Sequence, residues 1–563
     1  MVSWLLTACL LAAVCAAAGA ANTVFPPGAP PADIVDVVDA RKATPSMRLA
    51  GAMLQGLANR GPRASVYMLH PGDSDQFWLE HLKAKGYLGR TRNLTLPAFF
   101  ERYGERYRKV FVYDPELTGS MNAAIMLGAL EDGLAASPDD AAALAGERPV
   151  EDLRGRWSSN AAAITWAYSH LWPRSSRAML ATMNPRADER SLYDYITQHR
   201  VFTFWITGQE RSDGKAARQL DERIVVERIL EAAPANIPVI GFWFSGQDHG
   251  INEYTGVGMA GETGQYTVVS STCGNLSLLS GIRVDWPAAV RRYTATLAER
   301  KPPELRRDRV YVCFEFTESG DAPLYLQNIQ WREWQDPARG KLPFNWNVGP
   351  AILEMAPPII EYFYDQATPN DYFYVALSGA GYNHPYRHLF SKVRDPEAAW
   401  RGYMAQTRGF MRRMGLTELQ LYTDAWLPFD RGRNDAITER FANGIPELRS
   451  IVLGMGRDEG VDPDHANYYV GRRPVLVSHC MTRWDVDYAG KTREQNIAWL
   501  VDDIKAHAPR ERPGFMHAMV LSWAYDPTEY VEVVRRLGEE FVPVTLAEFA
   551  RLYARAHARP EKG

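Results

Sequence analysis

In the second half of the chain, several strand-like runs are followed directly by acidic and aromatic residues. One carboxyl group can protonate a leaving oxygen while another activates water, and indole faces stack on the C–H faces of sugar rings. These residue types at the ends of strands therefore point to the hydrolysis of glycosidic bonds. The set comprises Glu318, Asp321, Asp424, Trp426, Trp484 and Trp523.

A glycine-rich aromatic turn follows another strand-like run, residues 372–377. Residues 378–385 read Ser-Gly-Ala-Gly-Tyr-Asn-His-Pro. Gly379 and Gly381 permit backbone angles that are closed to other residues, and Tyr382 is stiff enough to hold a shaped surface. The chain does not continue into the further glycines or the Lys-Ser/Thr pair of a phosphate loop. We therefore expect Gly379, Gly381, Tyr382 and His384 to form part of a sugar-binding surface.

Short apolar runs and long amphipathic segments alternate through the second half of the chain. This alternation predicts a parallel sheet, and seven repeats favour a β/α barrel whose loops build the site at the carboxyl ends of the strands. The Lys-, Arg- and Pro-rich stretch 300–309 separates this domain, residues 305–563, from the preceding one. The predicted strands are 310–316, 372–377, 419–423, 450–453, 475–478, 515–521 and 541–545, and helices are predicted at 397–414, 491–506 and 528–539.

The first half of the chain shows a different pattern, which occurs three times. A β-rich run is followed by an acidic or polar break, a helix and a second apolar run, in the segments 34–69, 110–134 and 201–241. Residues 22–300 are accordingly predicted to form a domain of three divergent α/β repeats. The fold class is thus α/β throughout.

Bulk properties limit the partners of the protein. A net charge of −4 and 23% charged residues among 563 create no field that would attract nucleic acid. Residues 1–20 are predicted to be a signal peptide, because an apolar stretch ends in Ala-Gly-Ala, so we expect a secreted or periplasmic protein. No later run is apolar and long enough to span a membrane. Cys273, Cys313 and Cys480 have no metal-type spacing, and neither a metal nor a cofactor is predicted.

Residues 379–385 resemble the signature of the GxGYxYP family of putative glycoside hydrolases, with His384 where that signature has a second Tyr. The segments 54–60, 275–277 and 340–350 also resemble the family, so the resemblance covers nearly the whole mature chain. It implies a first domain of three divergent repeats, a seven-stranded β/α barrel, and a carbohydrate-cleaving site in the cleft between them.

The resemblance also implies a catalytic set, made of a Glu from the first domain and two Asp in a turn after the first barrel strand. The offset along the chain from residues 275–277 assigns this Glu to Glu253, with Glu262 as the alternative. Asp321 keeps the second Asp, whereas Ser319 stands where the first is expected. Glu318 could replace that missing acid only with a shift of one residue.

Two carboxyl groups in different environments suggest a mechanism. Glu253, held protonated, would donate its proton to the glycosidic oxygen, while ionised Asp321 would activate water from the opposite face of the sugar. This arrangement inverts the anomeric centre and requires a carboxyl separation of roughly 6.5 to 9.5 Å. Trp346 is a further candidate for stacking on the sugar.

Two other functions fit the same residues. His384 and His388 have the His-x-x-x-His spacing of metal-dependent carbohydrate deacetylases, with Asp321 as a possible third ligand. Such an enzyme would lose activity in a chelator. Alternatively, Ser319 in place of an acid fits a carbohydrate-binding protein without catalytic activity.

Overall fold

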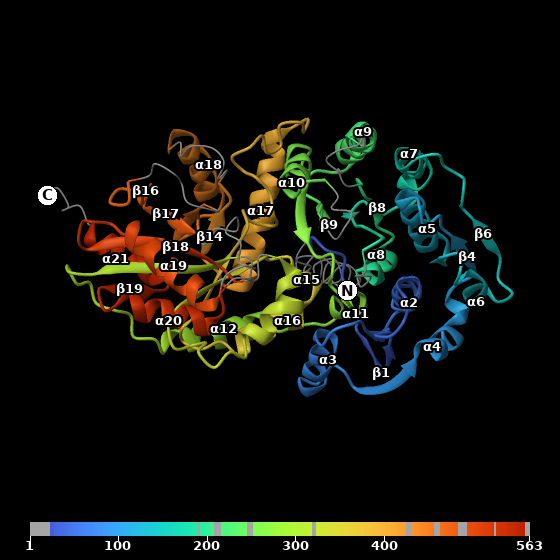
Figure 1. Ribbon diagram of the computed structural model, residues 1–563, viewed down its shortest axis with the longest axis horizontal. Helices are drawn as coiled ribbons and strands as arrows, with labels where there is room; N and C mark the ends of the chain where they lie inside the picture. Colours follow the sequence, from blue (N-terminus) through green and yellow to red (C-terminus); the bar gives the residue numbers. More distant parts are fainter. Residues whose placement is uncertain are drawn as a thin grey trace, which may run out of the picture.

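The protein is described here by a computed structural model, which covers residues 23–187, 192–207, 216–244, 251–317, 322–423, 431–454, 462–481, 492–522 and 525–557. Three small parallel sheets lie within residues 31–269, and one large curled sheet lies within residues 310–544. In Figure 1 the small sheets lie to the right and the large sheet lies to the left. The chain is therefore a mixed α/β protein built mainly on parallel sheets.

The small sheets follow one another along the chain. Their strand orders are β2-β1-β3, β5-β4-β6 and β10-β9-β7-β8, and every pairing within them is parallel. The strands are β1 (Pro31–Asp39), β2 (Ala64–Leu69), β3 (Arg90–Thr95), β4 (Lys109–Val112), β5 (Gly133–Ala136), β6 (Val150–Asp152), β7 (Leu180–Thr182), β8 (Phe202–Phe204), β9 (Pro238–Gly241) and β10 (Tyr266–Val269).

The helices of this half begin at sites that the sequence marks. Thr44 caps the first of them by accepting a hydrogen bond from the backbone N–H of Met47, and Pro45 occupies the first turn, where its missing N–H costs nothing. The longer helices are α2 (Pro45–Ala58), α3 (Ser74–Ala84), α4 (Leu96–Arg102), α5 (Thr118–Glu131), α7 (Asn160–His170), α8 (Tyr193–His199), α9 (Ala216–Ala232), α10 (Glu253–Glu262) and α12 (Trp286–Ala298).

The large sheet has the strand order β12-β13-β14-β15-β17-β18-β11-β19, and β16 pairs with β17. Its pairings are parallel, except for the β16–β17 hairpin. A further parallel pairing between β11 and β12 brings distant parts of this order together, so the sheet curls round. The strands are β11 (Val310–Thr317), β12 (Phe344–Val348), β13 (Asp371–Val375), β14 (Glu418–Leu421), β15 (Ser450–Leu453), β16 (Tyr468–Val470), β17 (Arg473–Met481), β18 (Gly514–Leu521) and β19 (Phe541–Val544).

Helices alternate with these strands, as the sequence pattern predicts. Each of the seven predicted strands and three predicted helices is present, with ends that differ by a few residues. Among the described residues the sheet has nine strands, and two of them, β12 and β16, were not predicted. The helices are α16 (Pro357–Asp365), α17 (Pro396–Met414), α18 (Arg431–Gly444), α19 (Arg493–Ala506), α20 (Pro527–Leu537) and α21 (Leu546–Ala556), with the short turns α13 (Pro323–Tyr325), η3 (Leu326–Gln330), α14 (Trp331–Glu333) and α15 (Ile352–Met355) between β11 and α16.

Buried amides join α2 to the segment after β10. The side-chain amide of Gln55 donates to Asn275 Oδ1 at 2.8 Å, and that of Asn59 donates to Ser277 Oγ at 2.9 Å. All four residues are fully buried. Two of the segments that resemble the GxGYxYP family, 54–60 and 275–277, therefore connect the first small sheet with the third.

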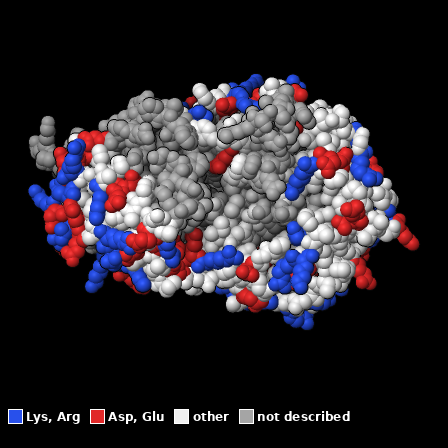
Figure 2. All heavy atoms as spheres, viewed as in Figure 1, with Lys and Arg blue, Asp and Glu red and all other residues white. Residues whose placement is uncertain are grey.

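Figure 2 shows Lys and Arg mixed with Asp and Glu over the described surface of this face. No described helix is long and apolar enough to cross a membrane.

Candidate active site

The glycine-rich turn follows β13 and is held in place by α17. Gly379 has a φ of +115°, and a Cβ at this position would lie 2.6 Å from Thr407 Oγ1, so only glycine fits without strain. The Tyr403 hydroxyl donates to the carbonyl oxygen of Ser378 at 2.8 Å, and Thr407 Oγ1 accepts from the N–H of Ala380 at 3.0 Å. Two side chains of one helix thus fix the shape of the turn.

The same turn contacts the third small sheet. Tyr382 and Thr267 of β10 exchange backbone hydrogen bonds of 2.8 and 2.9 Å in an antiparallel bridge. A Cβ on Gly381 would lie 2.4 Å from the Tyr266 ring and 2.8 Å from the Thr267 carbonyl oxygen, so the glycine permits this close approach. The turn therefore joins the large sheet to the small ones.

This bridge places Tyr382 against the predicted acid. Glu253 is the first residue of α10, whose N-cap Asn252 accepts a hydrogen bond from the N–H of Tyr254 at 3.0 Å. Burial raises the pKa of the Glu253 carboxyl above its ordinary value, and a hydrogen bond from the Tyr382 hydroxyl opposes part of that rise. The structure thus brings together two residues that the sequence predicted for one site.

His384 lies in a box of aromatic rings beside this pair. Its ring centroid is 4.3 Å from that of Tyr254, 4.8 Å from that of Tyr422 and 5.5 Å from that of Tyr382. The guanidinium of Arg387 lies 4.3 Å from the centroid of the Tyr254 ring. The sequence did not single out Tyr254, which directly follows Glu253, or Tyr422, which lies within the predicted strand 419–423.

Several predictions change in the structure. Trp346 is fully buried in β12, packed against Trp334 and Phe344, and its indole N–H donates to Asp371 Oδ1 at 3.0 Å. It has no free face for a sugar, so the stacking prediction was wrong. Gly379 and Gly381 are buried and support the turn rather than bind substrate.

Other predicted residues lie outside the described part of the chain, so the separation between Glu253 and Asp321 is untested. They are Glu318, Asp321, Asp424, Trp426, Trp484 and Trp523.

The two histidines of the deacetylase alternative differ in their exposure. His384 is 4% exposed among its aromatic neighbours, whereas His388 is exposed and has a φ of +45°. Among the described residues, no three His, Cys, Asp or Glu side chains are grouped as a metal site would need. Asp321, the third ligand of that alternative, is not among them.

The sequence did not identify two further groups, an acid with a raised pKa and a buried acid–histidine pair. Burial, together with the charge of Asp526, raises the pKa of Glu333 in α14 to about 8. Inside the curled sheet, Glu315 Oε2 lies 2.8 Å from His517 Nε2 and 3.4 Å from the side-chain amide of Gln420, and all three residues are fully buried. An isolated acid or histidine within an apolar run gives no sequence signal of such a partner.

Comparison with known proteins places this geometry in a family. Four GxGYxYP domains match the chain: the first over residues 34–104, the second over 109–175, the third over 177–281, and the "putative glycoside hydrolase C-terminal domain" over 308–554. No curated protein sequence matches it. A crystal structure of a putative hydrolase from Bacteroides thetaiotaomicron VPI-5482 matches with a TM-score of 0.74 and 17% identity, over 95% of this chain and 97% of that chain. The structure of Puue allantoinase matches with a TM-score of 0.29 and 12% identity, over 46% of this chain and 100% of that chain.

Proposed function

Because the chain belongs to the GxGYxYP family of putative glycoside hydrolases, we propose that it cleaves poly- or oligosaccharides in a cleft between the small sheets and the large sheet. In this proposal the curled sheet is a seven-stranded barrel with additions, and the small sheets are three divergent repeats. The observation that carries the proposal is the Glu253–Tyr382 contact, because it joins the predicted acid to the family's own turn.

The setting of Glu253 suits a general acid. A raised pKa keeps more of the carboxyl protonated near neutral pH, where it can donate to the glycosidic oxygen. Asp321 is the proposed base, and Glu318 could replace the acid that is missing at Ser319. Tyr382 and His384 would shape the sugar subsite, and Asp424, Trp426, Trp484 and Trp523 would complete it. We also propose export by the signal peptide of residues 1–20.

A screen of polysaccharides and oligosaccharides for release of reducing ends tests the proposal. We expect Glu253→Gln and Asp321→Asn each to lower kcat by about 100-fold or more, because each removes a proton-transfer group. Glu262→Gln is the matched control on the same helix, since Glu262 forms an ion pair with Lys392 at 2.9 Å. If Glu253→Gln and Asp321→Asn both keep full turnover of a substrate that the wild type cleaves, the site assignment is wrong.

The stereochemistry is tested separately, on the same substrate. An inverting enzyme releases a product of the opposite anomeric configuration, which proton NMR detects early in the reaction. Retention would replace the proposed water activation with a covalent intermediate. Sugar binding without any turnover would instead favour the non-catalytic alternative that Ser319 suggests.

A further inference from the structure

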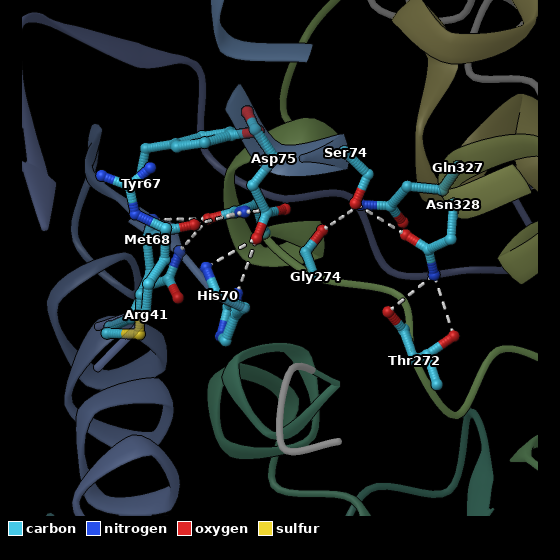
Figure 3. A network of polar contacts seen from close by, with 12 residues as sticks. Arg41, Tyr67, Met68, His70, Ser74, Asp75, Thr272, Gly274, Gln327 and Asn328 are labelled. Carbon is cyan, nitrogen blue, oxygen red and sulfur yellow. Dashed lines mark hydrogen bonds and ion pairs between the residues drawn. The ribbon is translucent and has the colours of Figure 1, made fainter. Parts of the chain in front are cut away.

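A pocket of 730 Å³ surrounds the N-terminus of α3, where three parts of the chain meet. We call it the α3 pocket. Its walls come from residues 70–75, which join β2 to α3, from Thr272 after β10, and from Leu324, Asn328 and Ile329 of α13 and η3. Figure 3 shows the polar contacts between these walls.

Hydrogen bonds fix the walls relative to one another. Asn328 accepts from Ser74 Oγ at 3.1 Å, and its side-chain amide donates to Thr272 Oγ1 at 2.9 Å. The neighbouring Gln327 donates to the Gly274 carbonyl oxygen at 2.8 Å. The pocket is therefore preformed, which lowers the entropic cost of binding a ligand.

His70 lines the pocket and forms a pair with Asp75. Its Nδ1 lies 2.9 Å from Asp75 Oδ2, which also accepts from the His70 backbone N–H at 2.8 Å. Asp75 Oδ1 accepts from the side-chain amide of Asn275 at 3.0 Å. His70 is only 8% exposed, yet its Nε2 has no hydrogen-bond partner among the residues that the structure describes.

These contacts determine where the imidazole carries its proton. Asp75 is surrounded by donors, and an ionised carboxylate only accepts hydrogen bonds, so Nδ1 of His70 carries the hydrogen. In the neutral ring Nε2 then has a free lone pair. A buried acceptor without a partner is costly, so a ligand that donates a hydrogen bond here relieves that cost.

The other lining groups indicate what kind of ligand it is. Arg48, Arg332, Asp73 and Asp75 balance in formal charge, which favours a neutral ligand over a phosphate. Ile329 is 37% exposed and offers an apolar face. Hydroxyl groups on an apolar ring face are the chemistry of a carbohydrate.

We propose that the α3 pocket is a carbohydrate subsite in which His70 Nε2 accepts a hydrogen bond from a sugar hydroxyl. The choice of ligand class rests on the proposed function. Two links connect the pocket to the candidate active site. Thr272 lies five residues after Thr267, which pairs with Tyr382, and Leu324 lies three residues after Asp321.

The test measures binding without catalysis. Calorimetry on the full-length Glu253→Gln variant gives Kd values for cellohexaose, xylohexaose, mannohexaose, maltohexaose and inorganic phosphate. Adding His70→Phe is expected to weaken binding of the sugar with the lowest Kd about tenfold, because phenylalanine has no acceptor and one hydrogen bond is lost. The matched control is His465→Phe, because His465 also pairs with an aspartate, Asp462, at 3.0 Å but is exposed at the surface. We expect it to leave Kd unchanged.

A second variant keeps the test valid if the His70 variant does not fold. Ile329→Ala removes an exposed side chain and is expected to weaken the same sugar without changing the unfolding midpoint. Three results would overturn the inference. They are an unchanged Kd in both the His70 and the Ile329 variants, no binding of any of the sugars by the Glu253→Gln protein, and competition by phosphate. Because binding is measured in a variant that lacks the proposed acid, absent turnover by the wild-type protein would refute the proposed function alone.

Discussion

Replacing Gly381 with alanine tests whether the turn joins the two parts of the protein. A Cβ at this position would lie 2.4 Å from the Tyr266 ring and 2.8 Å from the Thr267 carbonyl oxygen, well inside ordinary contact distance. Tyr266 is 1% exposed and Thr267 O accepts from Tyr382, so neither atom can move freely. Overpacking of this kind costs about 1–3 kcal/mol.

One effect opposes that cost. Alanine reduces the conformational freedom of the unfolded chain, which stabilises the folded protein by about 0.4–1 kcal/mol. The net expected loss in the free energy of unfolding is therefore roughly 0–2.6 kcal/mol. Urea denaturation followed by tryptophan fluorescence measures it.

Gly409→Ala provides the matched control. Gly409 lies in the interior of α17, and a Cβ there would meet no atom within 4 Å, so this change should stabilise the protein by about 0.5–1 kcal/mol. Hydrolytic activity should fall only in Gly381→Ala, because only that variant moves the Tyr382 hydroxyl relative to Glu253. If Gly381→Ala is as stable and active as the wild type, the turn does not hold the two parts together as described.

Two more substitutions address the polar groups of the site and the sheet interior. Tyr382→Phe removes a hydrogen bond that favours the charged form of Glu253, so the pKa of Glu253 should rise further. Since the acid must be protonated to act, the alkaline limb of kcat/KM against pH should move to higher pH, and a move to lower pH would contradict this assignment. Glu315→Ala leaves His517 buried without its carboxylate partner, and we expect a loss of about 3 kcal/mol or more in the free energy of unfolding. A loss below about 1 kcal/mol, a size typical of an exposed pair, would show that the two groups are not coupled.

The alternation of strands and helices in the second half was readable from the sequence, but β12 was not. Its residues 344–348 read Phe-Asn-Trp-Asn-Val, which has the strand period, yet both asparagines are fully buried. The side-chain amide of Asn345 donates to the Phe314 carbonyl oxygen at 2.8 Å, and Asn345 Oδ1 accepts from the N–H of Leu546. A strand whose inner positions are amides does not resemble an apolar run. The partners that satisfy these amides lie far away in the sequence, so the pattern gives no sign of them.

Contacts that are distant in sequence also decide the role of side chains that could serve either the core or the site. Trp346 had the residue type of a sugar platform, but only the positions of Phe344, Trp334 and Asp371 show that it belongs to the core. His70 and Asp75 stand five residues apart across the start of a helix, a spacing that predicts no contact by itself. Residue type and spacing identify candidate residues, whereas burial and contact partners decide whether they serve the core or the site.

The candidate acid depends on the meeting of the two halves of the chain. Glu253 belongs to the half with the small sheets, and the hydroxyl that contacts it comes from a turn of the large sheet. Position 253 is also the first residue of α10, where the helix dipole favours the charged carboxylate. Burial outweighs the Tyr382 hydrogen bond, because the pKa is raised in spite of that bond. The protonation of Glu253 therefore depends on its burial and on its contact with Tyr382, whose backbone is held by the bridge to Thr267.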